Sequence, residues 1–251
     1  MDDSNDKAII VEDLEKRFGA FRAVKGISFS VKRGEIFGFL GANGSGKSTT
    51  IRMLCGILTP SSGRGVVNGY DIARQPEKVK QSIGYMSQKF SLYEDLTPLE
   101  NIRFYLGIYS LPVHLWPERT EWVLDLIRLG DAKNRLTRDL PPGWRQRLAL
   151  GCALLHRPDI IFLDEPTSGV DPATRRDFWD FIGSLAREGV TVFVTTHYMD
   201  EAMNCERLVM LSEGAIVASG SPAEIIGRVV PGNPQADLND AFIALMQRGA
   251  Q

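Results

Sequence analysis

Apolar residues recur along the chain in two patterns that predict strands and helices. Short runs in which apolar residues alternate or follow one another predict strands. We expect strands at 8–14, 24–31, 36–40, 65–67, 83–86, 160–163, 191–195, 208–211 and 215–218. Apolar residues three and four positions apart predict amphipathic helices. We expect helices at 51–58, 97–109, 116–129, 144–156, 199–204 and 238–246, and two that begin at Pro172 and Pro222.

The order of these elements predicts the class of fold. The first third is rich in antiparallel pieces, with a hairpin signal at Asn68-Gly69. Strand signals stop at about 89–157, where only helices are expected. The wholly apolar run 160–163 is then typical of a central parallel strand. We therefore predict an α/β fold with a mainly parallel central sheet, an N-terminal antiparallel β subdomain and a helical insert subdomain.

Composition and charge indicate one large globular domain. The 251 residues are 43% hydrophobic, enough to fill a substantial core. The 29 basic and 31 acidic residues nearly cancel, so we expect no broad field for nucleic acid or anionic lipid. Three scattered cysteines, Cys55, Cys152 and Cys205, predict buried thiols in a reducing compartment, not a disulfide framework.

The ends of the chain and the lengths of its apolar runs bear on its location. Residues 1–7 are acidic and polar, unlike a signal peptide, and no apolar run approaches the roughly 18 residues that span a bilayer. We therefore expect a cytoplasmic chain that needs a partner for any work at a membrane. The stretch 231–234 reads Pro-Gly-Asn-Pro and interrupts the pattern, so we expect 229–251 to be a C-terminal appendage.

The stretch 41–49 contains the pattern G-x-x-x-x-G-K-[ST] between a predicted strand and a predicted helix. In that setting the pattern is a phosphate-binding loop. Its glycines allow backbone conformations in which successive N–H groups converge on an anion at the helix N-terminus. The expected nucleotide-binding residues of this loop are Gly41, Asn43, Gly44, Ser45, Gly46, Lys47, Ser48 and Thr49. A glycine-rich turn with a solvated lysine is the alternative, which the strand-to-helix setting disfavours.

Two side chains of the loop have specific expected roles. Lys47 is expected to reach the β- and γ-phosphates of a nucleotide. The hydroxyl of Ser48 is expected to ligate the Mg²⁺ ion that bridges those phosphates. Together with the parallel sheet, these residues predict a P-loop NTPase core.

Two carboxylates follow the predicted central strand. Asp164 is placed to hold Mg²⁺ through its water shell, and Glu165 to orient or deprotonate a water in line with the γ-phosphate. Ligands of parallel sheets bind at the carboxyl ends of the strands, where the loop at Gly41 is also expected. A charged loop after a strand is the alternative, and the upstream loop argues against it.

Three further candidates carry weaker signals. Gln88 ends a predicted strand and could point its amide at a metal or a water, although a single glutamine is more often a surface residue. His197 follows another strand at the same edge and could bind a γ-phosphate or hold the catalytic carboxylate. Phe18 could stack on a base or be a core or loop aromatic, and its spacing leaves both open.

Over about residues 8–228 the chain resembles the ATP-binding subunit of ATP-binding-cassette transporters. The matching parts are the Walker A loop at 41–49, Walker B at 160–164, the catalytic glutamate Glu165, the Q-loop glutamine Gln88, the D-loop at 168–171 and the switch histidine His197. Phe18 falls where the family places its base-stacking aromatic, which favours the stacking interpretation. The runs 88–93 and 195–202 look most like those of drug-export ATPases, including the second half of tandem forms.

The resemblance implies that two such domains, as a homodimer or a paired cassette, close around two molecules of ATP with Mg²⁺. Hydrolysis would reopen them and move a transmembrane subunit docked on the helical insert near 88–94. The chain would then lie at the cytoplasmic face of the membrane as a peripheral subunit, and no nucleic acid is expected. The implied catalytic residues are Lys47, Gln88, Glu165 and His197, and the implied metal-binding residues are Ser48, Gln88 and Asp164.

The chain departs from the family pattern at the signature that caps the ATP of the opposite subunit. The usual Leu-Ser-Gly-Gly-Gln is here Leu-Pro-Pro-Gly-Trp at 140–144. Pro141 removes the serine hydroxyl and a backbone N–H, and Pro142 removes a second N–H. Gly143, Trp144 and the helix dipole remain to face the anion, so we expect this loop to hold ATP weakly.

Two other classes of protein compete with an exporter motor. A soluble cassette ATPase acting on ribosomes or DNA would be expected to carry a coiled-coil insertion, paired cassettes or basic extensions, and this sequence contains none of these. A P-loop kinase would transfer phosphate to a small molecule. Glu165 beside Asp164 and the long helical insert argue against a kinase.

Overall fold

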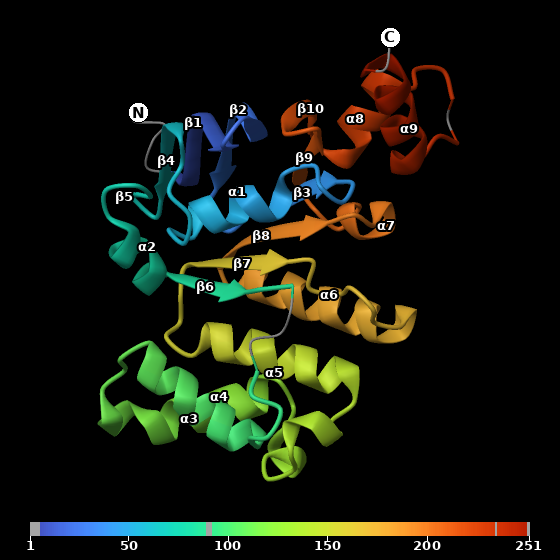
Figure 1. The fold of residues 1–251 in the computed structure, drawn as a ribbon. Coiled ribbons are helices and arrows are strands. Elements are labelled where there is room, and N and C mark those ends of the chain that lie inside the picture. Colours follow the sequence, from blue (N-terminus) through green and yellow to red (C-terminus); the bar gives the residue numbers. More distant parts are fainter. Residues whose placement is uncertain (1–5, 89–91, 234, 250–251) are drawn as a thin grey trace.

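Two sheets and a helical layer make up the computed structural model, which describes residues 6–88, 92–233 and 235–249 (Figure 1). The antiparallel sheet has the order β2 (Phe21–Lys32), β1 (Lys7–Phe18), β4 (Ser62–Val67) and β5 (Tyr70–Asp71). The second sheet has the order β10 (Ala215–Gly220), β9 (Arg207–Ser212), β3 (Ile36–Gly41), β8 (Thr191–Thr196), β7 (Ile160–Asp164) and β6 (Ile83–Met86). It is parallel from β9 to β6, and β10 joins antiparallel. The predicted α/β fold is confirmed.

The register of the central strands brings distant segments to one edge. Leu40 of β3 pairs with Thr196 of β8, and Thr195 pairs with Asp164 of β7. All five residues of β7 are buried, as a wholly apolar run ending in a carboxylate predicts. The loop after β3 and the residues after β7 and β8 therefore leave the sheet side by side.

A cluster of phenylalanine rings packs the two sheets together. Phe193 of β8 contacts the rings of Phe37, Phe39 and Phe162, with centroids 5.7, 5.3 and 5.3 Å apart. Phe29 of β2 completes the cluster from the antiparallel sheet. Because these rings come from β2, β3, β7 and β8, their burial fixes the strands that carry the predicted site residues.

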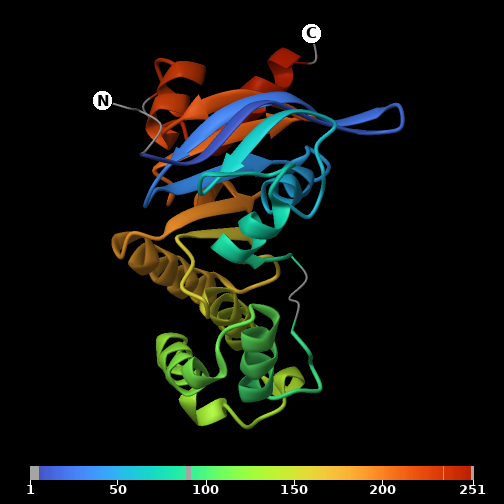
Figure 2. The same cartoon turned by 90° about the vertical axis from the view of Figure 1, so that its left-hand side faces the viewer.

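The strands β1 and β2 are longer than predicted. They extend past the expected bounds to Phe18 and back from Phe21, which pair across the turn formed by Gly19 and Ala20. Figure 2 shows the end of this hairpin projecting beyond the rest of the sheet.

Nine α-helices are present in the described residues: α1 (Lys47–Leu54), α2 (Pro76–Ser82), α3 (Pro98–Ile108), α4 (Trp116–Leu126), α5 (Pro142–Leu154), α6 (Pro172–Arg187), α7 (Met199–Ala202), α8 (Pro222–Val229) and α9 (Leu238–Gly249). The predicted start of α3 is confirmed by a capping box, in which the backbone N–H of Glu100 donates to Thr97 Oγ1 and the N–H of Thr97 donates to the Glu100 carboxylate.

Several predicted helix bounds were wrong. The sequence analysis missed α2, which buries only Val79 and so has no apolar stripe. The apolar positions at 51–58 indicated a helix after the loop, and α1 begins before them, at Lys47, and ends at Leu54. The sequence analysis also began the helix α5 at Trp144, whereas Pro142 occupies the first turn with Pro141 as the N-cap.

Helix α5 connects the helical insert to the core. Leu148, Cys152 and Leu155 share a buried cluster with residues of α3 and α4, as their spacing predicts. Leu150 and Leu154 pack instead with α6 and with β7. Helix α5 therefore packs both against α3 and α4 and against the strand that ends at Asp164.

The last helix packs against the core. Leu238 and Ala241 of α9 are buried in one cluster with Ile225 of α8 and Met210 of β9. The boundary predicted at 228/229 falls one residue before the end of α8, and the separation of an appendage there stays a prediction.

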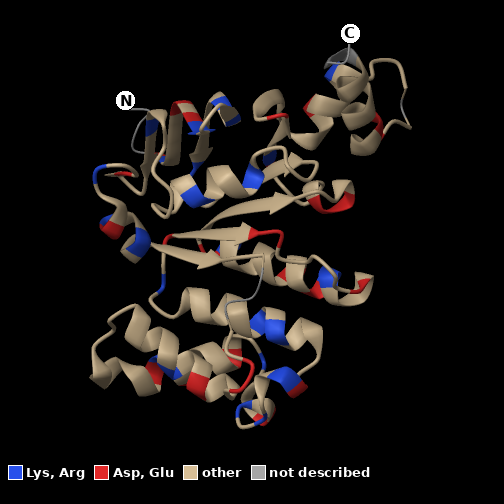
Figure 3. Ribbon diagram, viewed as in Figure 1, with Lys and Arg blue, Asp and Glu red and all other residues tan. Residues whose placement is uncertain are grey.

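The three cysteines are free and buried, as predicted. Among the helices of the described residues, none combines the length and the apolar character that a membrane span requires. Basic and acidic residues are interspersed along the ribbon of the helical insert and the core (Figure 3).

Candidate functional site

The predicted phosphate-binding loop joins β3 to α1. Gly46 is the N-cap of α1 with φ of +106°, and a Cβ there would lie 2.7 Å from the carbonyl oxygen of Ala23. Gly41 has no positive φ, contrary to the prediction, and is required for a different reason. A Cβ at Gly41 would lie 2.5 Å from Ser45 Oγ and 2.6 Å from the carbonyl oxygen of Leu211. Only glycine allows β9 and the loop to approach each other this closely.

Lys47 is buried and lies between the loop and the acidic edge of the sheet. Its Nζ donates to the carbonyl oxygens of Gly41 and Ala42 at 2.8 and 3.2 Å. It also lies 3.2 Å from Glu165 Oε1, in an ion pair that the sequence analysis did not foresee. The ammonium group is thus held at the first turn of α1, where a helix N-terminus attracts anions.

Asp164 is held by hydroxyl groups from two other elements. Thr195 Oγ1 donates to Asp164 Oδ1 at 2.7 Å and Ser48 Oγ donates to the same oxygen at 3.2 Å. Burial raises the pKa of Asp164, and these two hydrogen bonds oppose the shift. The predicted proximity of Ser48 and Asp164 is therefore present in the structure.

Glu165 occupies a strained backbone position with φ of +48°, which is rare for a residue with a side chain. Its N–H donates to both the carbonyl oxygen and Oγ1 of Thr195, at 3.1 and 3.0 Å. Its Oε2 accepts from Gln88 Nε2 at 2.9 Å and lies 3.2 Å from His197 Nδ1. The backbone conformation directs the carboxylate toward three of the other predicted catalytic residues: Lys47, Gln88 and His197.

A cavity of about 520 Å³ opens beside these groups. The residues that line it are Phe18, Phe21, Ala23, Asn43, Gly44, Gly46, Lys47, Ser48, Thr49, Gln88 and Glu165. Nine of these eleven were predicted from the sequence to bind nucleotide or act on it. A cavity with a phosphate-binding loop at one end and aromatic rings at the other suits a nucleotide.

The aromatic end of the cavity contains one ring that the sequence analysis missed. Phe18 and Phe21 face each other across the β1–β2 turn and are 51% and 65% exposed, so both rings are available to a ligand. Lys16 Nζ lies 5.2 Å from the centroid of the Phe18 ring. The core alternative for Phe18 is excluded. The two-residue turn at Gly19 was the signal that could have paired Phe21 with it.

Five predicted residues do not line the cavity. Asp164 and His197 contact the residues that do, Gly41 supports the loop, and the buried Ser45 hydroxyl has no hydrogen-bond partner in the described part of the chain. Gly143 lies on α5, where a Cβ would be 2.3 Å from Thr174 Cγ2 of α6. Its lack of a side chain is thus explained by packing within this chain, and a nucleotide contact by Gly143 stays a prediction.

The donor set fits Mg²⁺. Ser48 offers a hydroxyl, Asp164 a carboxylate and Gln88 an amide, all oxygen donors of the kind that Mg²⁺ prefers. Across residues 6–88, 92–233 and 235–249, no three His, Cys, Asp or Glu side chains are grouped closely enough to hold a metal alone. This pattern is typical of Mg²⁺ sites that are completed by the phosphates of a substrate.

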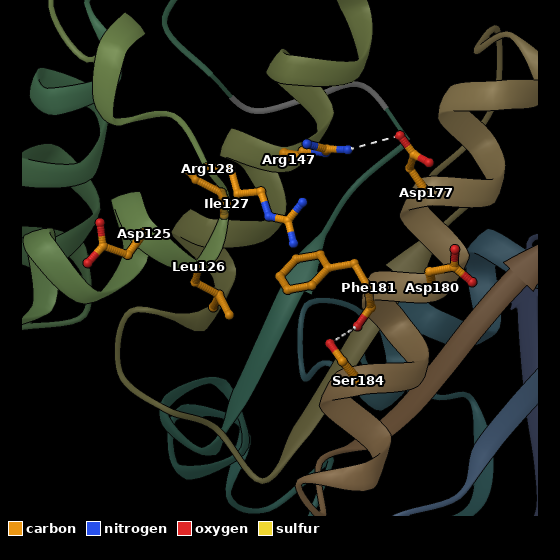
Figure 4. Close-up of a pocket in the computed structure, with 9 residues that line it drawn as sticks. All are labelled: Asp125, Leu126, Ile127, Arg128, Arg147, Asp177, Asp180, Phe181 and Ser184. Atoms are coloured by element: carbon orange, nitrogen blue, oxygen red, sulfur yellow. Dashed lines mark hydrogen bonds and ion pairs between the residues drawn. The ribbon is translucent and has the colours of Figure 1, made fainter.

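A second cavity of about 510 Å³ lies between α4, α5 and α6, away from the phosphate-binding loop (Figure 4). Its charged residues are mixed, and Arg147 is 3.3 Å from Asp177 across it. None of the predicted site residues lines this cavity. The groups suited to nucleotide chemistry therefore gather only at the first of these two cavities.

Comparisons with known proteins agree with this geometry. Residues 24–168 match the model of the family described as ABC transporter. The chain is 47% identical over 239 residues to the probable multidrug ABC transporter ATP-binding protein YbhF of Escherichia coli (strain K12), and the match covers 95% of this chain and 41% of that protein. It is 37% identical over 219 residues to the linearmycin resistance ATP-binding protein LnrL of Bacillus subtilis (strain 168), covering 87% and 70%. The chain thus spans less than half the length of YbhF.

Solved structures show the same architecture. An ATP-binding subunit of an ABC transporter has a TM-score of 0.83 at 28% identity, covering 95% of this chain and 99% of that chain. A dimeric post-hydrolysis structure of the ATP-binding cassette MJ0796, bound to ADP and Pi, has a TM-score of 0.76 at 26% identity, covering 85% and 98%.

The buried Asp164 predicts a pH-dependent stability difference. Asp164→Asn keeps an oxygen for Thr195 and Ser48 but removes the burial penalty on the charge. We expect the variant to be more stable than the wild type near neutral pH, by about 1.4 kcal/mol for each unit by which the pKa in the folded state exceeds its unfolded value. The gain should vanish as the pH falls through the raised pKa to the ordinary value of 3.8, because the wild-type carboxyl is then protonated in both the folded and unfolded states.

Thermal unfolding in EDTA at several pH values measures this difference, with the exposed Asp131→Asn as the matched control. A gain that is absent at neutral pH, or that grows on acidification, would contradict the assignment of Asp164 as a buried charged group.

Proposed function

Because this chain belongs to the ABC transporter family as one of its ATP-binding cassettes, we propose that it hydrolyses Mg-ATP in the cavity beside Lys47 and powers a membrane exporter. The contact of Glu165 with Lys47, Gln88 and His197, at the mouth of the phosphate-binding loop, is the observation that carries this proposal. The drug-resistance and multidrug names of LnrL and YbhF support export as the direction of transport.

The residues of the cavity divide the work of hydrolysis among them. Phe18 and Phe21 stack on the base, while the loop N–H groups and Lys47 bind the phosphates. Glu165 accepts a proton from water as the water oxygen attacks the γ-phosphorus, and the bond to the β-phosphate oxygen breaks to give ADP and phosphate. His197 holds the Glu165 carboxylate in line for this proton transfer.

Two further features affect turnover. The phosphates compete with Glu165 for the Lys47 ammonium, so that nucleotide binding frees the carboxylate to act as a base. Ser48, Asp164 and Gln88 hold Mg²⁺, which neutralises charge on the phosphate oxygens when it is bound.

A second cassette completes the site. The dimeric MJ0796 structure, with ADP and Pi, supports pairing as a homodimer or with another cassette. In this chain the signature helix α5 begins with Pro141 as N-cap, whose carbonyl oxygen accepts from the N–H groups of Trp144 and Arg145 at 3.0 and 3.1 Å. Pro141 and Pro142 offer no N–H, so this helix start binds the partner's γ-phosphate weakly.

A membrane subunit docks on the helical insert, and the chain is therefore a peripheral subunit at the cytoplasmic face of the membrane. Three exposed apolar residues support this: Tyr93 at 49%, Phe104 at 39% and Ile108 at 60%. The rings of Tyr93 and Phe104 touch edge to face at 4.7 Å, and Ile108 follows one turn along α3. Of the predicted docking residues 88–94, Leu92 is partly buried against the cluster of the helical insert and that of α5 and α6, and 89–91 lie outside the described residues.

The alternative, a soluble cassette acting on ribosomes or DNA, is not favoured by the relatives, which are named as ATP-binding proteins of multidrug transport and antibiotic resistance.

The catalytic assignment predicts opposite effects of two substitutions. Glu165→Gln removes the base and should lower kcat by about 10²- to 10⁴-fold while ATP still binds. Lys47→Ala should instead weaken ATP binding by about tenfold or more, because charge-assisted bonds to phosphate are lost. Steady-state hydrolysis and equilibrium ATP binding, with the exposed Glu188→Gln as control, separate the two. Undiminished turnover by Glu165→Gln would reject Glu165 as the base.

The signature predicts a slow ATPase and a weak homodimer. Pro141→Ser together with Pro142→Gly restores a hydroxyl and two N–H groups, each bond worth about 1.5 to 3 kcal/mol to a charged oxygen. We expect hydrolysis to rise and to saturate at lower protein concentration. Rate measured against protein concentration tests this. A natural chain that is already fast, and is unchanged by the substitutions, would show that the helix start suffices.

Because we propose that Tyr93, Phe104 and Ile108 contact the membrane subunit, a cysteine placed at position 108 should cross-link to it. The native cysteines are all buried, so Ile108→Cys supplies a reactive thiol with little background. We expect cross-linking to a co-expressed membrane subunit from position 108. We expect none from the control Ile243→Cys, because position 243 is an exposed site on α9, outside the helical insert. Equal labelling from both positions would contradict docking at the insert.

A further inference from the structure

Glu201 on α7 is a buried carboxylate that does not line the nucleotide cavity. The Glu201 side chain is 2% exposed, although acidic side chains on a short helix at the protein surface are usually solvated. Burial raises its pKa, and hydrogen bonds from Thr167 and Thr196 and the charge of Arg175 oppose that shift. Burying a carboxylate is unfavourable unless its partners compensate, so its contacts indicate what it does.

Both oxygens of Glu201 are bound by threonine hydroxyls. Thr167 Oγ1 donates to Oε1, and Thr196 Oγ1 donates to Oε2 at 2.7 Å. Arg175 of α6 lies 3.3 Å from Oε1 through its Nε. Each carboxylate oxygen of Glu201 therefore accepts one threonine hydroxyl, and the positive charge of Arg175 lies beside Oε1.

These two threonines belong to the segments that carry the catalytic pair. Thr167 follows Glu165 by two residues, in the turn after β7. Thr196 directly precedes His197, and its hydroxyl also accepts from the N–H of Tyr198 at 3.0 Å. A single carboxylate thus ties together the two chain segments that present Glu165 and His197 to each other.

The conformation of Glu165 needs such support. A residue with φ of +48° persists only where its surroundings hold it. Thr195 binds its N–H, and the carbonyl oxygen of the next residue, Pro166, accepts from the buried Gln146 amide. The bond from Thr167 to Glu201 is the third restraint, and through Glu201 it is linked to Thr196, the residue directly before His197.

We propose that Glu201 is a positioning residue for ATP hydrolysis, which holds the Thr167 and Thr196 segments so that His197 stays 3.2 Å from the Glu165 carboxylate. The inference rests on the proposed ATPase function, since it assigns a role to the Glu165–His197 contact. It makes Glu201 responsible for the rate of the chemical step and not for the binding of ATP.

The test is Glu201→Gln in the full chain. The amide keeps the shape and one acceptor oxygen, but its nitrogen cannot accept from a threonine hydroxyl and the charge facing Arg175 is lost. We expect kcat to fall about tenfold or more, because small displacements of catalytic groups strongly lower the rate of the chemical step. The KM for ATP and the Kd for ATP with EDTA should stay within about a factor of two.

Thr167→Val and Thr167→Ser form the matched pair. Valine keeps the volume without the hydroxyl and should reproduce the loss in kcat, whereas serine keeps the donor and should retain most of the rate. This pair also carries the test if Glu201→Gln does not fold. Glu188→Gln, which removes an exposed charge at the end of α6, controls for charge alone and should leave kcat unchanged.

The decisive comparison repeats Glu201→Gln in a His197→Ala background. A residue that acts through the Glu165–His197 contact should cause almost no further loss of kcat once His197 is gone. An equal loss in both backgrounds, or an unchanged kcat in the single variant, would overturn the proposal. A wild-type chain that hydrolyses no ATP would overturn the proposed function itself, so the two failures are distinguishable.

Discussion

The hydroxyl of Thr195 binds both acidic residues of the site, and the site depends on where the sheet places it. It donates to Asp164 and accepts from the N–H of Glu165, so that one side chain of β8 fixes the end of β7. This is possible because β7 and β8 are parallel neighbours in a register that sets Thr195 opposite Asp164. The phenylalanine cluster around Phe193, which lies two residues before Thr195 on β8, helps to maintain that register.

The same arrangement places several polar groups in an environment that disfavours charge. Lys47, Asp164, Glu165 and Glu201 are all nearly inaccessible to solvent, and each is tolerated because oppositely charged or hydrogen-bonding groups surround it. Removing one member leaves its partner buried and unsatisfied, so these residues form a connected set. The Glu165 carboxylate is held both by its direct contacts and by the segment that follows it.

Much of this could be predicted from the sequence, because the signals are local. The loop at 41–49 has a spacing of glycines, lysine and serine that few other structures require. The apolar run before Asp164 indicates a buried strand. The carboxyl ends of parallel strands lie at one edge of a sheet, so the residues that follow the strands were expected to lie close together there. This reasoning identified Lys47, Ser48, Asp164, Glu165 and His197, whereas Gln88 took its role from the resemblance to ATP-binding-cassette subunits.

The remainder depends on contacts between residues far apart in sequence. Nothing local links Thr195 to Asp164 or Glu201 to Thr167, because the pairings arise from strand register and from the packing of α7. The reason for Gly41 was also misjudged, since its close neighbour Leu211 is on another strand. Helix α2 was missed because a helix that buries one apolar residue has no periodic pattern to recognise.

The most direct test of the central claim is a crystal structure of the Glu165→Gln chain with Mg²⁺ and a non-hydrolysable ATP analogue. The account predicts phosphates in contact with Lys47 and the loop N–H groups, the metal beside Ser48 and Asp164, and the base against Phe18. An analogue bound elsewhere, or phosphates directed away from residue 165, would contradict it.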